Sequence, residues 1–176
     1  MCLHACQQRV IVACFLVLQR PACPVHSIDL GCNDLTEQGA SRLCQAMQLN
    51  SSVQYLSLRG NKIGHHGGLQ VAAMLQVNQT LQSLDMANTD ASTDVIIAMA
   101  TVLRFNRYLE SVDLSRPLLH SCREETTVHI AEMLRVNSHL MSLRLAKHGM
   151  TDSGVSVLCK SMRENNSLTF LDLSWY

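Results

Sequence analysis

The sequence contains eight histidines and eight cysteines, residue types from which metal centres and nucleophilic sites are often built. Residues 64–68 (GHHGG) have the glycine content of a phosphate-binding loop, but the Lys-Ser/Thr ending of such a loop is missing. His65 and His66 are adjacent, so their side chains diverge on any regular element and make a poor metal pair. We therefore expect a strand-to-helix turn at 64–68, no metal site, no cofactor, and a chain that is not an enzyme.

The elements that position these residues follow a 28-residue repeat, which joins a strand pattern to a helix pattern. Each unit opens with L-x-x-L-x-L spacing, in which alternate apolar residues face one side of a strand. A helical pattern follows, with apolar residues four apart on one face, as at Leu43 and Met47. One step, from Leu109 to Leu140, is three residues longer. The first strand position is held by Val25, Val53, Leu81, Leu109, Leu140 and Leu168.

This pattern predicts a shape as well as a set of elements. Neighbouring strands lie ~4.8 Å apart, whereas packed helices need ~8–10 Å. A stack that is narrow on its strand side and wide on its helix side must curve. We predict an α/β leucine-rich repeat solenoid, a right-handed superhelix of β–α units shaped as a segment of a horseshoe. Its parallel sheet is concave and its helices are convex, over residues 25–176.

The strand–turn–helix unit resembles the ribonuclease-inhibitor type of leucine-rich repeat protein, over most of the chain from Val25 to Tyr176. The resemblance implies large protein contacts on the concave face. Some related members activate GTPases in trans, which would require a charged residue at a rim turn, with Arg59 or Arg116 as the candidate. We predict a non-catalytic scaffold that binds a partner protein, with a GTPase-activating regulator and a secreted recognition receptor as alternatives.

Candidate contact residues lie on the outward positions of the strands and on the rim just after them. Aspartates such as Asp29 and Asp85 form a broken acidic row, which could read a basic partner segment. Tyrosine, tryptophan and arginine are the side chains that most often anchor interfaces. The predicted protein-binding residues are Tyr55, Arg59, Asp85, Asp113, Arg116, Arg144 and Trp175.

Two asparagine columns mark the turns. The first ends each helix, where we expect the left-handed conformation that asparagine tolerates; Asn50, Asn78 and Asn165 of this column also begin N-x-S/T sequons. The second follows each strand and loses its asparagine along the chain. The helix-end column is Asn50, Asn78, Asn106, Asn137 and Asn165, and the strand-end column is Asn33, Asn61, Thr89, Pro117, His148 and Tyr176.

The cysteines favour a reducing compartment. Cys44 and Cys159 occupy helix positions that other repeats fill with alanine, so we expect small buried side chains there. Five more cysteines, near His4 at the N-terminus, have spacings that match no zinc pattern. We predict reduced thiols in a cytoplasmic or nuclear protein, with a nucleolar location suggested by the resemblance. These five are Cys2, Cys6, Cys14, Cys23 and Cys32.

Charge and hydropathy narrow the class of partner. Fourteen basic residues balance fourteen acidic ones, which gives no electrostatic basis for binding nucleic acid directly. Residues 1–24 contain an apolar run from Val10 to Leu18 that is too short to span a bilayer. This segment fits a capping helix, in which Gln19 falls on the Met47 column, or the centre of a secretory signal.

Two further segments depart from the regular repeat. The three extra residues fall within 116–125, where Ser121 and Glu124 fit a helix capping box after a longer rim loop. The chain ends on the strand pattern LDLSWY, whose apolar residues would form an exposed sheet edge. We expect a truncated form of a longer array, and self-association through that edge.

Overall fold

The computed structural model describes residues 17–18, 20, 23–119 and 123–175, and in these six strands alternate with five helices. The predicted strand–helix order is confirmed in every unit. The strands are β1 (Ser27–Asp29), β2 (Tyr55–Ser57), β3 (Ser83–Asp85), β4 (Ser111–Asp113), β5 (Ser142–Arg144) and β6 (Phe170–Asp172). The helices are α2 (Glu37–Leu49), α3 (Gly64–Val77), α4 (Thr93–Leu103), α5 (Arg123–Val136) and α6 (Asp152–Met162).

The strands form one parallel sheet in sequence order, from β1 to β6. The register places each residue opposite its equivalent in the next repeat, as at Ile28, Leu56 and Leu84. The longer fourth repeat leaves this register intact, because Val112 still pairs with Leu143. The three extra residues are therefore accommodated in the loop and not in the strands.

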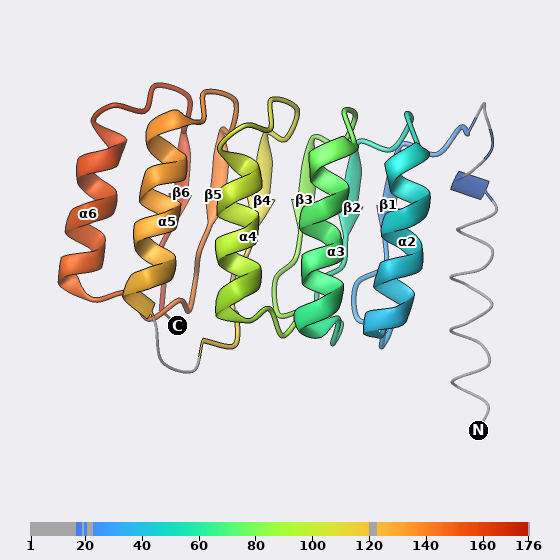
Figure 1. The fold of residues 1–176 in the computed structure, drawn as a ribbon, viewed down its shortest axis with the longest axis horizontal. Helices are drawn as coiled ribbons and strands as arrows, with labels where there is room; N and C mark the ends of the chain where they lie inside the picture. The colour runs from blue at the N-terminus through green and yellow to red at the C-terminus, as the bar shows by residue number, and fades with distance from the viewer. Residues whose placement is uncertain (1–16, 19, 21–22, 120–122, 176) are drawn as a thin grey trace.

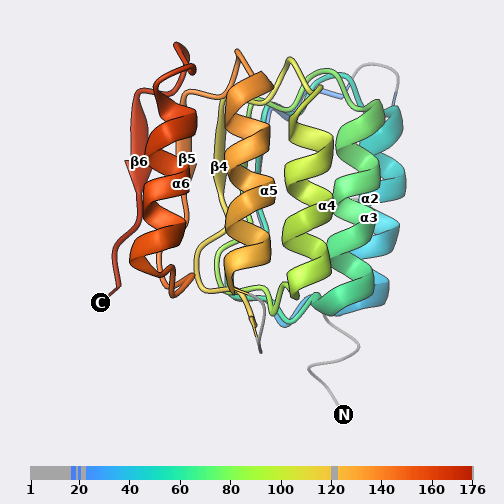
Figure 2. The ribbon, with the colours of Figure 1, turned by 60° about the vertical axis from the view of Figure 1, so that its left-hand side comes forward.

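The helices lie side by side in one layer in front of the sheet, and the core fills the space between the two layers (Figure 1, Figure 2). Leu56 and Leu143 of the sheet and Met47 and Leu103 of the helix layer are all 0 % exposed. Each inward column continues through its neighbours, so the repeats share one continuous core. The α/β leucine-rich repeat solenoid predicted from the spacing is the observed fold.

The segment 64–68 forms the first turn of α3. Gly64 has φ +62°, a left-handed conformation that favours glycine. At Gly68 a Cβ atom would lie 2.6 Å from Val95 Cγ1, so glycine allows α3 and α4 to approach closely. His65 Nδ1 lies 2.9 Å from Ser92 Oγ in the next repeat. These glycines therefore serve the turn and the packing.

The helix-end asparagines do not adopt the predicted left-handed conformation. Asn50 (φ −82°, ψ 132°) and Asn78 (φ −68°, ψ 130°) are extended. Instead, the buried Asn78 side chain donates from Nδ2 to the carbonyls of Met47 (2.7 Å) and Asn50 (3.1 Å) in the preceding repeat. Its Oδ1 accepts the Leu81 amide at 2.8 Å. The prediction was wrong because bonds between repeats, and not a local preference, set these turns.

In the strand-end column, by contrast, the side-chain hydrogen bonds become fewer between Asn61 and His148. Asn61 is fully buried, donates to the carbonyls of Leu30 (2.7 Å) and Leu58 (2.8 Å), and accepts the amides of Asn33 and Leu35. His148 keeps only the equivalent of the first bond, from Nε2 to Leu114 O at 2.9 Å. Its Nδ1 is buried without a partner among the described residues. The residue equivalent to Asn33 is Pro117, which has no amide hydrogen to donate.

The two cysteines of the small-residue helix column differ in burial. Cys44 is buried, and desolvation raises its thiol pKa to about 12, but Cys159 is exposed, contrary to the prediction. Cys44 faces α3, whereas no described helix follows α6 to cover Cys159. Asn50 Nδ2 donates to Leu18 O (3.1 Å), as Asn78 Nδ2 does to Met47 O one repeat later. Gln19, which was predicted for the Met47 column, lies outside the described residues. Residues 1–16 and Ser121 of the capping box lie outside the described residues.

Candidate protein-binding face

The outward face of the sheet is formed by the first and last residue of each strand. The first positions run through Tyr55, Ser83 and Ser111, and the last positions through Asp85 and Asp113, in continuous parallel register. Each strand is only three residues long, so its central residue points to the core and its two ends point outward. The predicted contact residues of the strands are therefore brought together on one surface.

The acidic row has a structural role that spacing alone did not reveal. Asp85 Oδ1 accepts the amide of Ala87 at 2.9 Å, and Asp113 Oδ1 accepts that of Ser115 at the same distance. Asp172 repeats this contact with Ser174, and this bond is the main reason why its carboxyl pKa is lowered. Each aspartate thus fixes the backbone as it leaves its strand, and one carboxylate oxygen is already in use.

The aspartates also differ in accessibility. Asp113 is only 9 % exposed. Burial raises the pKa of Asp85 above its usual range, and Arg59 Nη1 lies 3.8 Å from its Oδ2 in a half-exposed ion pair. Arg59 is therefore partly engaged within the face. Contact of Asp85 and Asp113 with a partner stays a prediction. Because Asp113 is nearly buried, little of its carboxylate surface is available for such a contact.

The turns after the strands hold a column of left-handed residues. Gly60 (φ 67°) occupies this position in the second repeat, but Arg116 (φ 59°) and Lys147 (φ 65°) occupy it in the fourth and fifth. The ladder of backbone bonds continues here, because Arg116 N donates to Ala146 O at 2.8 Å. Successive residues of this column therefore lie about one strand spacing apart, ~4.8 Å. Among the described residues, neither Arg116 nor Lys147 forms an ion pair.

Arg144, the last residue of β5, is a third cation, three residues before Lys147, and it stands in register between Asp113 and Asp172. Its guanidinium lies 4.9 Å from the Phe170 ring centroid, and Lys147 Nζ lies 5.6 Å from that of Trp175. Both distances fall in the cation–π range. Arg116, Arg144 and Lys147 form what we call the basic rim cluster, with Trp175 60 % exposed at its border. Tyr55 lies apart from this cluster on β2, where it is half-buried.

A second surface, which was not predicted from the sequence, lies at the C-terminal ends of the helices, on the rim opposite the strand ends. The residue before each helix-end asparagine is apolar and exposed in the first four repeats. This column could have been found from the sequence, because it directly precedes the asparagine column. Its members are Leu49 (77 % exposed), Val77 (56 %), Phe105 (72 %) and Val136 (50 %).

Within the described chain, no group of three or more histidine, cysteine or acidic side chains could hold a metal ion. None of the described helices is both long and apolar enough to cross a bilayer. Self-association through β6 stays a prediction.

Comparison with protein families agrees with the geometry. A model described as "Leucine Rich repeat" matches residues 22–44, 49–72 and 136–159. These segments contain β1, β2 and β5, each with the first part of the helix that follows it (α2, α3 and α6). The matched segments are leucine-rich repeats, and the described chain as a whole folds as a leucine-rich repeat solenoid of strand–helix units.

Among curated proteins, the chain is similar to leucine-rich repeat-containing protein 34. It is 46 % identical to the mouse protein over 61 residues, which is 35 % of this chain and 15 % of that protein. It is 44 % identical to the human protein over 61 residues, covering 13 % of it. The matched stretch is therefore a small part of the relatives.

Two solved structures share the fold at low sequence identity. A leiomodin-1 fragment described as actin-binding site 2 superimposes with a TM-score of 0.75 and 19 % identity, covering 86 % of this chain and 87 % of that one. The tropomodulin C-terminal domain of Caenorhabditis elegans gives 0.74 and 7 % identity, covering 88 % and 92 %. At these identities the likeness concerns the fold alone.

Proposed function

We propose that this chain is a non-catalytic scaffold that binds a partner protein through the outward face of its sheet and the strand-end rim. The contact centres on the basic rim cluster, where Arg116, Arg144 and Lys147 receive an acidic segment of the partner. Tyr55, Arg59 and Trp175 provide contacts further along the same surface. The aspartates Asp85 and Asp113 mainly hold the backbone that presents these side chains.

One observation carries this proposal. Arg116 and Lys147 adopt the left-handed conformation, which costs an L-residue about 1–2 kcal/mol relative to the right-handed one. Equivalent turns place Cys32, Gly60 and Asn88 in the same left-handed conformation, so the fold requires this conformation but does not require a cation there. Two like charges on neighbouring turns also repel each other. An unfavourable conformation and an unfavourable charge pair at one place are a common mark of a functional site.

The fold supports the same class of function. The leiomodin-1 fragment of this fold is described as an actin-binding site, so a solenoid of this shape serves protein binding elsewhere. Monomeric actin is therefore a reasonable first whole-protein probe. An acidic peptide, (Asp-Glu-Ala)₅, and its basic counterpart, (Lys-Arg-Ala)₅, test the charge preference directly.

The decisive variant is the double substitution Arg116→Gly with Lys147→Gly, because glycine keeps the turn conformation and removes both charges. We expect the acidic peptide to bind roughly tenfold more weakly to this variant at low salt, a loss of about 1.4 kcal/mol. Fluorescence anisotropy with labelled peptides measures it, and Lys62→Gly, an exposed cation on the same rim, is the matched control. Equal affinity for the two peptides, or unchanged binding by the double variant, would overturn the proposed site.

We also propose that the protein acts in the cytoplasm or nucleus, including the nucleolus. Glycosylation at Asn50 or Asn78 would require an Nδ2 atom that is already hydrogen-bonded inside the fold. These buried amides favour a compartment without N-glycosylation over a secreted receptor. Expression in a secretory pathway tests this: efficient glycan addition to the folded protein at Asn78 would contradict it.

A further inference from the structure

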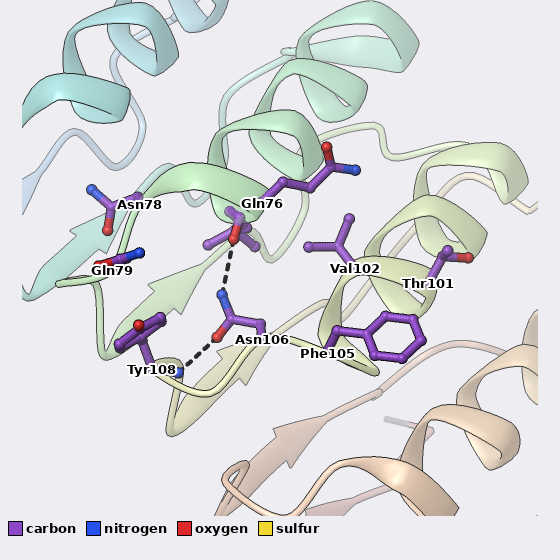
Figure 3. Close-up of a pocket in the computed structure, with 9 residues that line it drawn as sticks. Gln76, Asn78, Gln79, Thr101, Val102, Phe105, Asn106 and Tyr108 are labelled. Carbon is purple, nitrogen blue, oxygen red and sulfur yellow. Dashed lines mark hydrogen bonds between the residues drawn. The ribbon is translucent and has the colours of Figure 1, made fainter.

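A groove runs along the helix-end rim, on the side of the solenoid opposite the basic rim cluster. A cavity of ≈ 310 Å³ lies where α3 and α4 end, and Figure 3 shows Gln76, Phe105 and Tyr108 among the side chains around it. A second cavity of ≈ 230 Å³ adjoins it, because both are lined by Gln79 and Tyr108. We call the two cavities together the amide groove.

The amide groove is uncharged. Every residue that lines its two cavities is neutral, and four are glutamines: Gln54, Gln76, Gln79 and Gln82. Arg104 does not line the cavities, but its guanidinium lies 5.8 Å from the Phe105 ring centroid. Such a lining offers no counter-charge to a strongly acidic or basic ligand. The chemistry of the groove therefore differs from that of the basic rim cluster, where three cations gather.

The groove also contains unused hydrogen-bonding groups. Asn106 is fully engaged, since it donates to Leu75 O at 2.9 Å and accepts the Tyr108 amide at 3.0 Å (Figure 3). In contrast, the exposed side-chain amides of Gln76 and Gln79 bond to no other described residue. These two amides and the Tyr108 hydroxyl remain available to a ligand that brings unpaired carbonyl groups.

The apolar column beside the groove has a regular spacing. Phe105 lines the first cavity, and Val77 holds the equivalent position in the preceding repeat, between the lining residues Gln76 and Asn78. Both Val77 and Phe105 are more than half exposed. Adjacent packed helices are ~8–10 Å apart, which sets the step from one apolar side chain to the next. A polyproline II segment advances ~9.3 Å in each three-residue turn, so its successive turns match the column.

We propose that the amide groove binds an uncharged, proline-containing segment of a partner protein in the polyproline II conformation. Backbone carbonyls of such a segment are not paired internally and can accept hydrogen bonds from Gln76 and Gln79. Its proline rings pack on Phe105 and Tyr108, as in other aromatic-lined grooves for proline-rich peptides. A helical partner would match the spacing of the column but would leave the glutamine amides unpaired, because a helix satisfies its own backbone.

The test is a titration of the whole chain with a labelled (Pro-Pro-Ala)₄ peptide, followed by NMR of the side-chain amides. We expect saturable binding, shifts of the Gln76 and Gln79 amide signals, and at least fivefold weaker binding by Tyr108→Ala and by Gln79→Ala. The matched control is Val157→Ala, an exposed apolar position on α6 outside the groove, which should bind as the wild type does. A urea unfolding curve for each variant excludes loss of folding as the cause.

Any of these results would overturn the proposal: no saturable binding of the proline peptide, equal binding of a (Gly-Ser-Ala)₄ peptide, or preferential binding of an amphipathic helical peptide. The Arg116→Gly, Lys147→Gly variant separates this site from the basic rim cluster. It should bind the proline peptide normally even though it loses the acidic peptide. Loss of proline-peptide binding in this variant would likewise contradict the assignment.

Discussion

The two rims of the solenoid are built by different rules. At the helix-end rim, asparagine closes each of the five helix-to-strand turns between α2 and β6 in the described chain. Its side chain donates to a carbonyl of the preceding helix, at 2.7 Å for Asn78 and 2.9 Å for Asn106. At the strand-end rim Asn61 donates to Leu30 O and Leu58 O, whereas the next three repeats place threonine, proline and histidine at the equivalent position. One rim is uniform and the other varies.

The difference shows where a repeat protein can change without losing its fold. A uniform hydrogen-bond ladder fixes the helix-end turns, so variation there is confined to exposed residues between the asparagines. The strand-end turns lack some of the side-chain hydrogen bonds that Asn61 makes, although their backbone bonds continue. Arg116 and Lys147 lie on this less regular edge. One cost at this edge is the buried Nδ1 of His148, which has no hydrogen-bond partner among the described residues.

The largest expected effect comes from breaking the uniform rim. Asn78→Ala removes two donated bonds and leaves the amides of Thr80 and Leu81 without their Oδ1 acceptor. At about 1 kcal/mol for each net hydrogen bond, the free energy of unfolding should fall by about 4 kcal/mol. Urea denaturation followed by circular dichroism measures the change, and Gln38→Ala, an exposed position on α2, should leave the midpoint unchanged.

An equal loss of stability is not expected at the varied rim. Thr89→Ala removes only the bond from Oγ1 to Met86 O (2.8 Å), so it should cost about 1 kcal/mol. If Thr89→Ala proved as damaging as Asn78→Ala, the contrast between the two rims would be lost.

The next effect concerns pH. Burial lowers the pKa of His148 from 6.5 to about 4. Between these pH values its imidazole is protonated in the unfolded chain and neutral in the folded chain. Stability contributed by neutral His148 is complete above pH 6.5 and is lost as the pH falls towards 4. At about 1.36 kcal/mol per pH unit, the loss reaches ~3 kcal/mol.

The measurement is the urea midpoint between pH 7 and pH 4 for the wild type and for His148→Asn, which restores the side chain found at Asn61. Carboxyl groups also titrate in this range in both proteins, so the informative quantity is the difference between the two curves of urea midpoint against pH. Parallel curves would mean that His148 is not the group responsible for the acid sensitivity.

The smallest effect has the opposite sign. Arg116→Gly and Lys147→Gly should each raise the free energy of unfolding by about 0.5 kcal/mol. Relief of the left-handed conformation, about 1–2 kcal/mol, exceeds the added entropy of glycine in the unfolded chain, about 0.4–1 kcal/mol. Thermal unfolding measures the gain. A lower melting temperature would remove the argument that these cations are retained for binding at the expense of stability.

Much of the fold was predictable, because burial follows directly from spacing. The apolar columns through Leu56 and Leu75 predicted the strands, the helices and the shared core. The conformation of Asn78 was wrongly predicted, since the local preference of asparagine was outweighed by two bonds to the preceding repeat. Cys159 was placed in the core by its column, although a column position is buried only when a neighbouring element covers it.

The candidate site was predicted only in outline. Spacing placed Asp85 and Asp113 on the outward face, but it could not show that each already accepts an amide two residues ahead. Nor could it show that Arg116 and Lys147 are left-handed, because neither residue type favours that conformation. The amide groove brings together residues from three successive helix-to-strand turns, which only the stacking of the repeats aligns.

The sequence by itself determined the repeating unit and the side chains that leave water, because the periods of a strand and a helix decide which residues share a face. Only the tertiary structure decided which polar groups remain free. A hydrogen-bond partner in a solenoid usually lies one repeat away, as Met47 does for Asn78, so its presence depends on how the repeats stack.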